Sequence, residues 1–112
     1  AQAKQDATVE SLVGTIVVEP PVGAGPVPLG KGENKKIPEG TVIRVDDTSE
    51  AFVTFGNHTL RLFPGTTIRL DRLRSPRYRS SDLPDTVHLT LMGGQVVVGA
   101  QRAVRDYRLS WA

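Results

Sequence analysis

The stretch from Ile37 to Leu70 is the part of the sequence that most constrains the fold. It contains four short runs rich in Val, Ile, Thr, Phe and Leu, and each run ends at a Gly, Pro, Asn or Asp turn. Short runs of this composition, divided by turn residues, are typical of β-strands and leave no room for a helix of ordinary length. The centre of the chain is therefore predicted to be all-β.

The same pattern continues on both sides of this stretch. Val9–Glu19 is predicted to form one strand, with Gly14 as a bulge or a point of close approach. Gly56-Asn57 between two β-rich runs predicts a tight type I′ or II′ hairpin. Further strands are expected over residues 41–45, 51–55, 58–62, 66–70, 86–92, 95–98 and about 102–111. About eight or nine short, mostly antiparallel strands with Pro/Gly turns predict a compact sandwich or roll.

The chain of 112 residues is long enough for one domain with a modest core. Residues 1–8 are expected to form a polar tail, and residues 9–112 the single β domain. The sequence contains no cysteine, which excludes disulfides and thiolate chemistry. No apolar run reaches the roughly 18 residues of a membrane span, so no membrane insertion is expected. The start Ala1-Gln2-Ala3 fits the removal of a signal peptide and an arbitrary boundary equally well.

Charge is divided unevenly along the chain. Residues 1–60 carry a net charge of −3, and residues 61–112 a net charge of +5 in which every basic residue is arginine. Arginine favours planar, bidentate pairing with carboxylates. Two interpretations stay open: ion pairs within the chain across adjacent strands, or complementary patches that bring copies or a partner together head to tail.

Two segments are candidate contact surfaces for a partner. The Pro/Gly loop 20–28 is expected to be exposed, and residues 71–85, which carry several arginines and few apolar residues, are expected to form a long surface loop. This arginine-rich loop is interpreted as a solvated loop, a protein contact or a site for an anionic polymer. The partner-contact candidates are Arg69, Arg72, Arg74, Arg77, Tyr78, Arg79, Pro20, Pro21 and Val22.

Catalysis, metal binding and nucleic-acid binding are not expected. His58 and His88 lie on separate predicted strands, and no nearby serine or carboxylate makes either one part of a catalytic arrangement. Asp46, Asp47 and Glu50 lack the ligand spacing of a calcium loop and are interpreted as a turn. Only Tyr78 accompanies the arginines, whereas single-strand binders stack bases on several rings. No cofactor or metal is predicted, and the chain is not expected to be an enzyme.

Five motifs follow one another in a recognisable order along the chain. They are Gly-Thr-Ile-Val-Val (14–18), Val-Pro-Leu-Gly-Lys-Gly (27–32), Ile-Pro-Glu-Gly-Thr-Val-Ile-Arg-Val (37–45), the segment from Ser49 to Leu70, and Val-His-Leu-Thr-Leu-Met-Gly-Gly-Gln-Val-Val-Val (87–98). This order resembles the FecR-like domain family over roughly residues 7–110. The sequence departs from the family at two turns: Arg44 is followed by Val45-Asp46-Asp47 where the family has Thr-Gly, and Gly56-Asn57 stands where the family has Asp-Gly.

The resemblance implies an extracytoplasmic, all-β module that contacts other proteins, as in regulators that relay a signal from an outer-membrane receptor to a sigma factor. Two functions are therefore predicted. The first is a non-catalytic, extracytoplasmic protein-binding module in the periplasm, at the cell surface or secreted. The alternative is a structural subunit that assembles with copies of itself into a filament or surface layer, by strand addition and complementary charged faces. The expected partner is a protein or the chain itself, with a homo-oligomer as one outcome.

Overall fold

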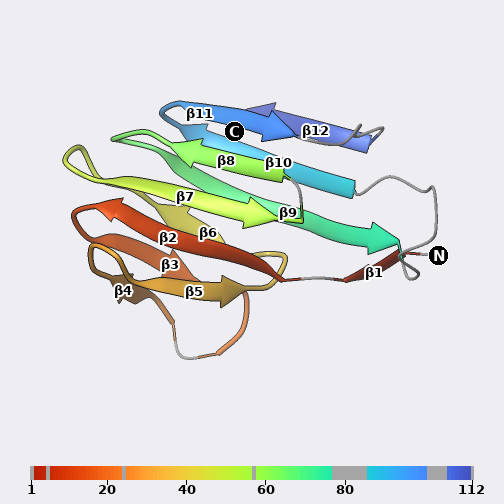
Figure 1. The fold of residues 1–112 in the computed structure, drawn as a ribbon, viewed down its shortest axis with the longest axis horizontal. Coiled ribbons are helices and arrows are strands. Elements are labelled where there is room, and N and C mark those ends of the chain that lie inside the picture. The colour runs from red at the N-terminus through yellow and green to blue at the C-terminus, as the bar shows by residue number, and fades with distance from the viewer. Residues whose placement is uncertain are drawn as a thin grey trace.

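The computed structural model describes residues 2–4, 6–23, 25–56, 58–76, 86–100 and 106–111. These residues form strands and turns, and the strands lie in two sheets that pack face to face (Figure 1). The prediction of an all-β sandwich is confirmed. All of the strand pairs are antiparallel except the pair of β10 with β12, which is parallel.

Each sheet draws its strands from several parts of the chain. The first sheet contains, in spatial order, β12 (Asp106–Trp111), β10 (Thr86–Gly93), β9 (Thr67–Pro76), β6 (Val42–Arg44), β3 (Ile16–Glu19) and β4 (Val27–Leu29), and β1 (Gln2–Lys4) also pairs with β9. The second sheet contains, in order, β11 (Val96–Ala100), β8 (His58–Leu62), β7 (Glu50–Phe55), β2 (Ala7–Val13) and β5 (Asn34–Ile37).

The core lies between the two sheets and follows from the alternation along each strand. In β7, for example, Ala51, Val53 and Phe55 are buried, whereas Thr54 faces solvent. Successive side chains of a strand point to opposite faces, so one apolar residue in two is enough to form the inner face of a sheet. The hairpin from β7 to β8 pairs Phe55 with His58, and Gly56 has φ +57°, so the predicted two-residue connection is confirmed.

Strand β9 is longer than predicted, and a bulge keeps its alternation in phase with the core. Ile68 and Leu70 are buried, as expected. The register shifts between Leu70, opposite Leu89, and Arg72, opposite His88, so that Asp71 is an extra residue. A regular alternation from Leu70 would point Arg72 into the core, whereas the bulge shifts the phase by one so that Leu73 takes the buried position. The expected loop over residues 71–85 is therefore wrong for residues 71–76, which continue the strand.

The first half of the chain contains more strands than predicted. The single strand expected over 9–19 is two strands in different sheets, because Gly14 (φ +68°) turns the chain from β2 to β3. A Cβ on Gly14 would lie 2.4 Å from Ser49 Oγ, which confirms the close approach. Residues 2–4 form β1 and Ala7 is fully buried in β2, so the expected tail 1–8 is not a tail.

Two further short strands lie at sheet edges where the sequence suggested only connections. Residues 31–36 were expected to form a polar connection, yet β5 begins at Asn34 and pairs with β2. The loop expected over residues 20–28 ends earlier, because Val27 and Pro28 pair with β3 as part of β4. Proline is accepted there because β4 is an edge strand, whose outward groups need no partner. With β1 and the division at Gly14, these strands raise the predicted eight or nine to twelve within the described residues.

The turn between β10 and β11 allows a sharp test of this packing. Gly94 has φ +88°, and a Cβ added there would lie 2.4 Å from Thr66 Oγ1, whereas an added Cβ on Gly93 has no atom within 4 Å. We expect Gly94→Ala to lower the free energy of unfolding by at least about 2 kcal/mol, through the strained backbone and the clash. Gly93→Ala is the matched control and should change it by less than about 0.5 kcal/mol. Equal losses in urea unfolding would contradict the described turn.

Candidate docking surface

Three of the predicted contact residues lie together on the outer face of the first sheet. Arg69, Arg72 and Arg74 all belong to β9 and point away from the core. Arg77, Tyr78 and Arg79 lie outside the described residues. The three described arginines differ in the hydrogen bonds and ion pairs that they make within the chain. These contacts decide which of the three can bind a partner.

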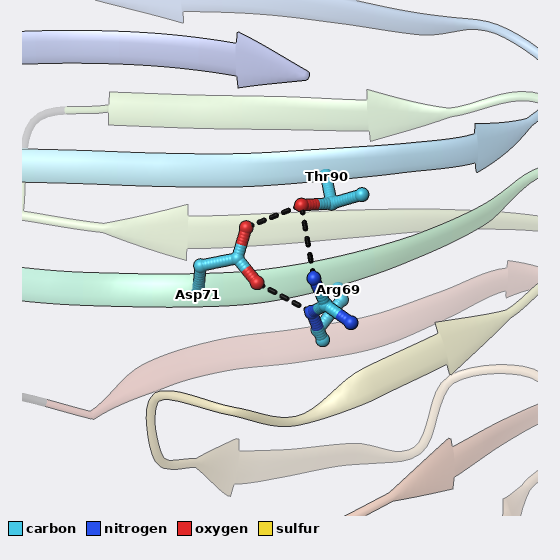
Figure 2. Close-up of polar contacts among 3 residues, drawn as sticks. All are labelled: Arg69, Asp71 and Thr90. Atoms are coloured by element: carbon cyan, nitrogen blue, oxygen red, sulfur yellow. Dashed lines mark hydrogen bonds and ion pairs between the residues drawn. The ribbon is translucent and has the colours of Figure 1, made fainter. Parts of the chain in front are cut away.

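Arg69 is held by groups on two strands. Its Nε donates to Asp71 Oδ1 at 2.5 Å and its Nη2 donates to Thr90 Oγ1 at 3.3 Å, while Thr90 Oγ1 donates to Asp71 Oδ2 at 2.5 Å (Figure 2). Thr90 is only 7% exposed, so the hydroxyl at the centre of this cluster is shielded from water. The cluster fixes the bulged Asp71 against β10, and it has a structural role within the sheet.

Arg74 is bound still more completely. Its Nε and Nη2 donate to the two carboxylate oxygens of Glu39 at 2.8 Å and 3.1 Å, and the same carboxylate accepts the backbone N–H of Leu73 at 3.0 Å. These hydrogen bonds to the Glu39 carboxylate raise the pKa of Arg74, while partial desolvation acts in the opposite direction. A bidentate arginine–carboxylate pair of this geometry fixes both side chains. Arg74 therefore ties the turn before β6 to β9.

The described ion pairs favour pairing within the chain over charged patches. Arg44 pairs with Glu19 on the neighbouring strand β3, and Arg61 pairs with Glu50 at 3.0 Å across β8 and β7. Arg61 also lies over the ring of Phe63, 5.4 Å from its centroid. Arg72 is exposed and makes no ion pair with another described side chain. It is the one predicted arginine that the described part of the chain leaves available.

The predicted Pro/Gly contact loop adjoins this face. Val22 is 86% exposed, and Pro21 packs beside Gly40, where an added Cβ would lie 3.0 Å from the Pro21 ring. The N–H of Gly40 donates to the carbonyl of Leu70 in β9. The turn at Gly40 thus contacts both predicted surfaces, the Pro/Gly loop and strand β9 with its arginines. Pro20 follows the last residue of β3 and begins this loop.

A third surface, which sequence reasoning missed, is the free edge of the second sheet at β11. Within the described strands β11 pairs only with β8. The N–H of Phe63 donates to the carbonyl of Gln95, which sets the phase of this antiparallel pair. Hydrogen-bonded and non-hydrogen-bonded positions alternate along such a pair. The backbone groups of Val96, Val98 and Ala100 therefore point outward, away from β8.

The side chains at this edge leave the core incompletely covered. Val98 lies opposite Leu60, which is buried, so Val98 points to the core side of the sheet, yet it is 37% exposed. Val97 points to the outer side and is 50% exposed. A core-facing valine with a third of its surface in water indicates that the inner layer has room for one more strand beside it.

Two other sheet edges, β5 and β4, carry the usual protection against pairing. Edge strand β5 exposes Asn34, Lys35 and Lys36, and edge strand β4 contains Pro28. Lysine and proline on an edge discourage the addition of another strand. Residues 93–101 contain no charged residue and no proline. This neutral run is visible in the sequence, but its position at an edge follows only from the sheet order.

Comparison of the chain with protein-family models, with curated proteins and with solved structures gave no match. The FecR-like resemblance thus stays a prediction from the sequence. In the described part of the chain, no three His, Asp or Glu side chains gather in a way suited to a metal ion. The same residues include no helix with the length and apolar character needed to cross a membrane.

Thr66 positions the β11 edge, and its hydroxyl can be tested directly. The hydroxyl is fully buried, accepts the N–H of Gln95 and donates to the carbonyl of Gln95, both at 3.0 Å. Thr66→Val should lower the free energy of unfolding by about 1–3 kcal/mol, because a buried N–H loses its acceptor. Thr66→Ser keeps the hydroxyl and should cost clearly less. Chemical denaturation measures both, and equal costs would show that the hydrogen bonds of the hydroxyl contribute no more to stability than the methyl group does.

Proposed function

We propose that this chain is a non-catalytic protein-binding module that works outside the cytoplasm and accepts an extended segment of its partner as an added strand along β11. The observation that carries the proposal is Val98, a core-facing residue that is 37% exposed on a neutral edge strand. Strand addition is a common mode of peptide recognition, in which backbone hydrogen bonds give affinity and alternate side chains give specificity.

The physical fit is specific to an extended, uncharged segment. The outward backbone groups of Val96, Val98 and Ala100 follow the spacing of a strand and match the groups of an incoming one. Inward residues of that segment would lie beside Val98 and would cover apolar surface now in water. A charged residue at those positions would lose hydration, so the edge favours apolar or small residues there.

The location of the protein is a separate part of the proposal. It is supported by the resemblance of the motifs to the FecR-like family, whose members carry this domain outside the cytoplasm. Signal relay and surface interaction are the two roles that such a module serves in that family. Both require an exposed surface for another protein, which is what β11 offers.

The β11 edge can be tested by amide hydrogen exchange of dilute, monomeric protein. We expect fast exchange at the outward amides of Val96, Val98 and Ala100, and slow exchange at Val97 and Gly99, whose amides bond to β8. A synthetic peptide of alternating Thr and Val should slow the outward amides when added. Protection of these amides in the free monomer would contradict the proposal, because it would show that the chain itself covers the edge.

Matched variants distinguish the edge from the arginine face. Val98→Lys should weaken peptide binding, whereas Val13→Lys, at a valine that is 46% exposed on β2, should not. Arg72→Glu should also leave peptide binding unchanged, because Arg72 lies on the other sheet. Loss of binding with Arg72→Glu alone would move the docking surface to the arginine face. Reversal of Arg74 is not a clean test, since it would break the pair with Glu39.

A structural subunit is the second candidate, and β1 is the observation that favours it. Strand β1 pairs with Arg74–Pro76 of the first sheet, and the chain then crosses to β2 in the second sheet. A terminal strand held by so short a pairing is suited to exchange between neighbouring copies. On this second candidate, the full chain should form filaments visible by negative-stain microscopy, and removal of residues 1–5, which spares the buried Ala7, should abolish them. Filaments that persist without these residues would contradict strand exchange.

A further inference from the structure

We infer that the segment accepted by β11 is the β11 strand of a second copy, paired antiparallel about a two-fold axis at Val98. This inference rests on the proposed function only in requiring that the edge is open. It commits to one partner, the chain itself, and to one register. Three properties of the strand carry it: its backbone phase, its side-chain pattern and its lack of charge.

The backbone phase allows complete self-pairing. The outward groups belong to Val96, Val98 and Ala100, as set by the pairing of β11 with β8. An axis at Val98 places this residue opposite its own copy and places Val96 opposite Ala100 of the second copy. Each of these pairs is a hydrogen-bonded pair of an antiparallel ladder, so every outward N–H and C=O of the three residues gains a partner.

The side chains then match on both faces of the joined sheet. On the core side, Val98 would lie beside Val98 of the second copy and lose much of its 37% exposure. Val96, which already packs on the core, lies on the same side of the sheet as Val98. On the outer side Val97, 50% exposed, would lie opposite Gly99, which leaves space for it. Directly opposed β-branched residues are among the favourable cross-strand pairs.

Charge distinguishes this pairing from the other combinations of edges. Residues 93–101 carry no charge, so two β11 strands bring no like charges together. Two β5 strands would oppose Lys35 and Lys36, and β4 offers Pro28 without an N–H. The nearest described charge on the neighbouring strand, Arg61, is paired with Glu50. Of the three edges β11, β5 and β4, β11 is thus the one suited to pair with itself.

The symmetry has a consequence for assembly. A contact between identical patches closes on itself and yields a dimer, whereas a filament needs a contact between two different patches. The joined sheets would run continuously across the two-fold axis. Because a strand-to-strand contact buries less area than a standard interface, we expect a weak dimer that forms reversibly as concentration rises.

Sedimentation equilibrium over a concentration series of the full chain provides the test. The wild type should pass from monomer to dimer and form no larger species through this edge. Val98→Lys should weaken the dimer at least about 10-fold, because each dimer would hold two like charges directly opposite each other. Val13→Lys is the control at a similarly exposed valine and should leave the dimer unchanged. Equal weakening by both variants would overturn the assignment to β11.

A cysteine cross-link tests the register. The chain contains no cysteine, so Val98→Cys introduces a single thiol per copy. In the inferred register the two Cα atoms at position 98 lie about 5.5 Å apart, a separation that a disulfide can bridge. Mild oxidation should therefore join Val98→Cys chains much faster than Val13→Cys chains. Preferential joining of Val97→Cys instead would overturn the axis at Val98.

The outcomes separate this inference from the proposed function. If the wild type stays monomeric at millimolar concentration while its edge amides bind the Thr/Val peptide, the second copy is excluded and strand addition by another protein stands. If the outward amides are protected in the monomer, both ideas fail together. If the protein dimerises and Val98→Lys has no effect on it, the dimer uses another surface and this inference is wrong.

Discussion

The reciprocal contact between Thr66 and Gln95 is the constraint on which the described sandwich most depends. The chain crosses from one sheet to the other between β8 and β9, and again between β10 and β11. Thr66 belongs to the first crossing and Gln95 to the second, and the buried hydroxyl of Thr66 bonds both backbone groups of Gln95. Gly94 approaches Thr66 so closely that no Cβ fits between them. Because each crossing supports the other, the spacing of the two sheets at this end and the position of β11 are set together.

Strand β9 shows how the fold covers backbone groups that no long neighbouring strand can pair. After Arg69, which lies opposite the first residue of β6, β9 continues beside other parts of the chain. Leu70 bonds to Gly40 and Thr41, and the Glu39 carboxylate accepts the N–H of Leu73. Strand β1 then pairs with the last residues of β9. A carboxylate thus stands where a neighbouring strand would provide a carbonyl, and Arg74 holds that carboxylate in place.

Strands could be predicted from the sequence where the local alternation of apolar and polar residues defines them. They could not be predicted where their bounds depend on which strands are neighbours in the sheet. The buried positions of Ile68 and Leu70 follow from a period of two, and the hairpin at Gly56 follows from turn chemistry. The division at Gly14 and the continuation of β9 to Pro76 depend on partners far along the chain. Residues 71–76 appear loop-like in sequence because their charges face solvent, and only the bulge at Asp71 reconciles them with a strand. The contact surface was predicted partly from arginines, and two of them, Arg69 and Arg74, make ion pairs within the chain.

The arginines of β9 and the exposed valines of β11 therefore indicate different contact surfaces in this molecule. Arginines dominate the second half of the sequence, yet Arg69 and Arg74 are held by Asp71 and Glu39, and these contacts tie strands together. A partner that displaced them would have to break charge-assisted hydrogen bonds that are partly shielded from water. The β11 edge requires no such exchange, since among the described strands it pairs only with β8 and Val98 gains by burial. In the part of the chain that the structure describes, other segments cover the open part of β9, whereas β11 pairs with β8 alone. This difference is the physical reason to look for recognition at the neutral edge.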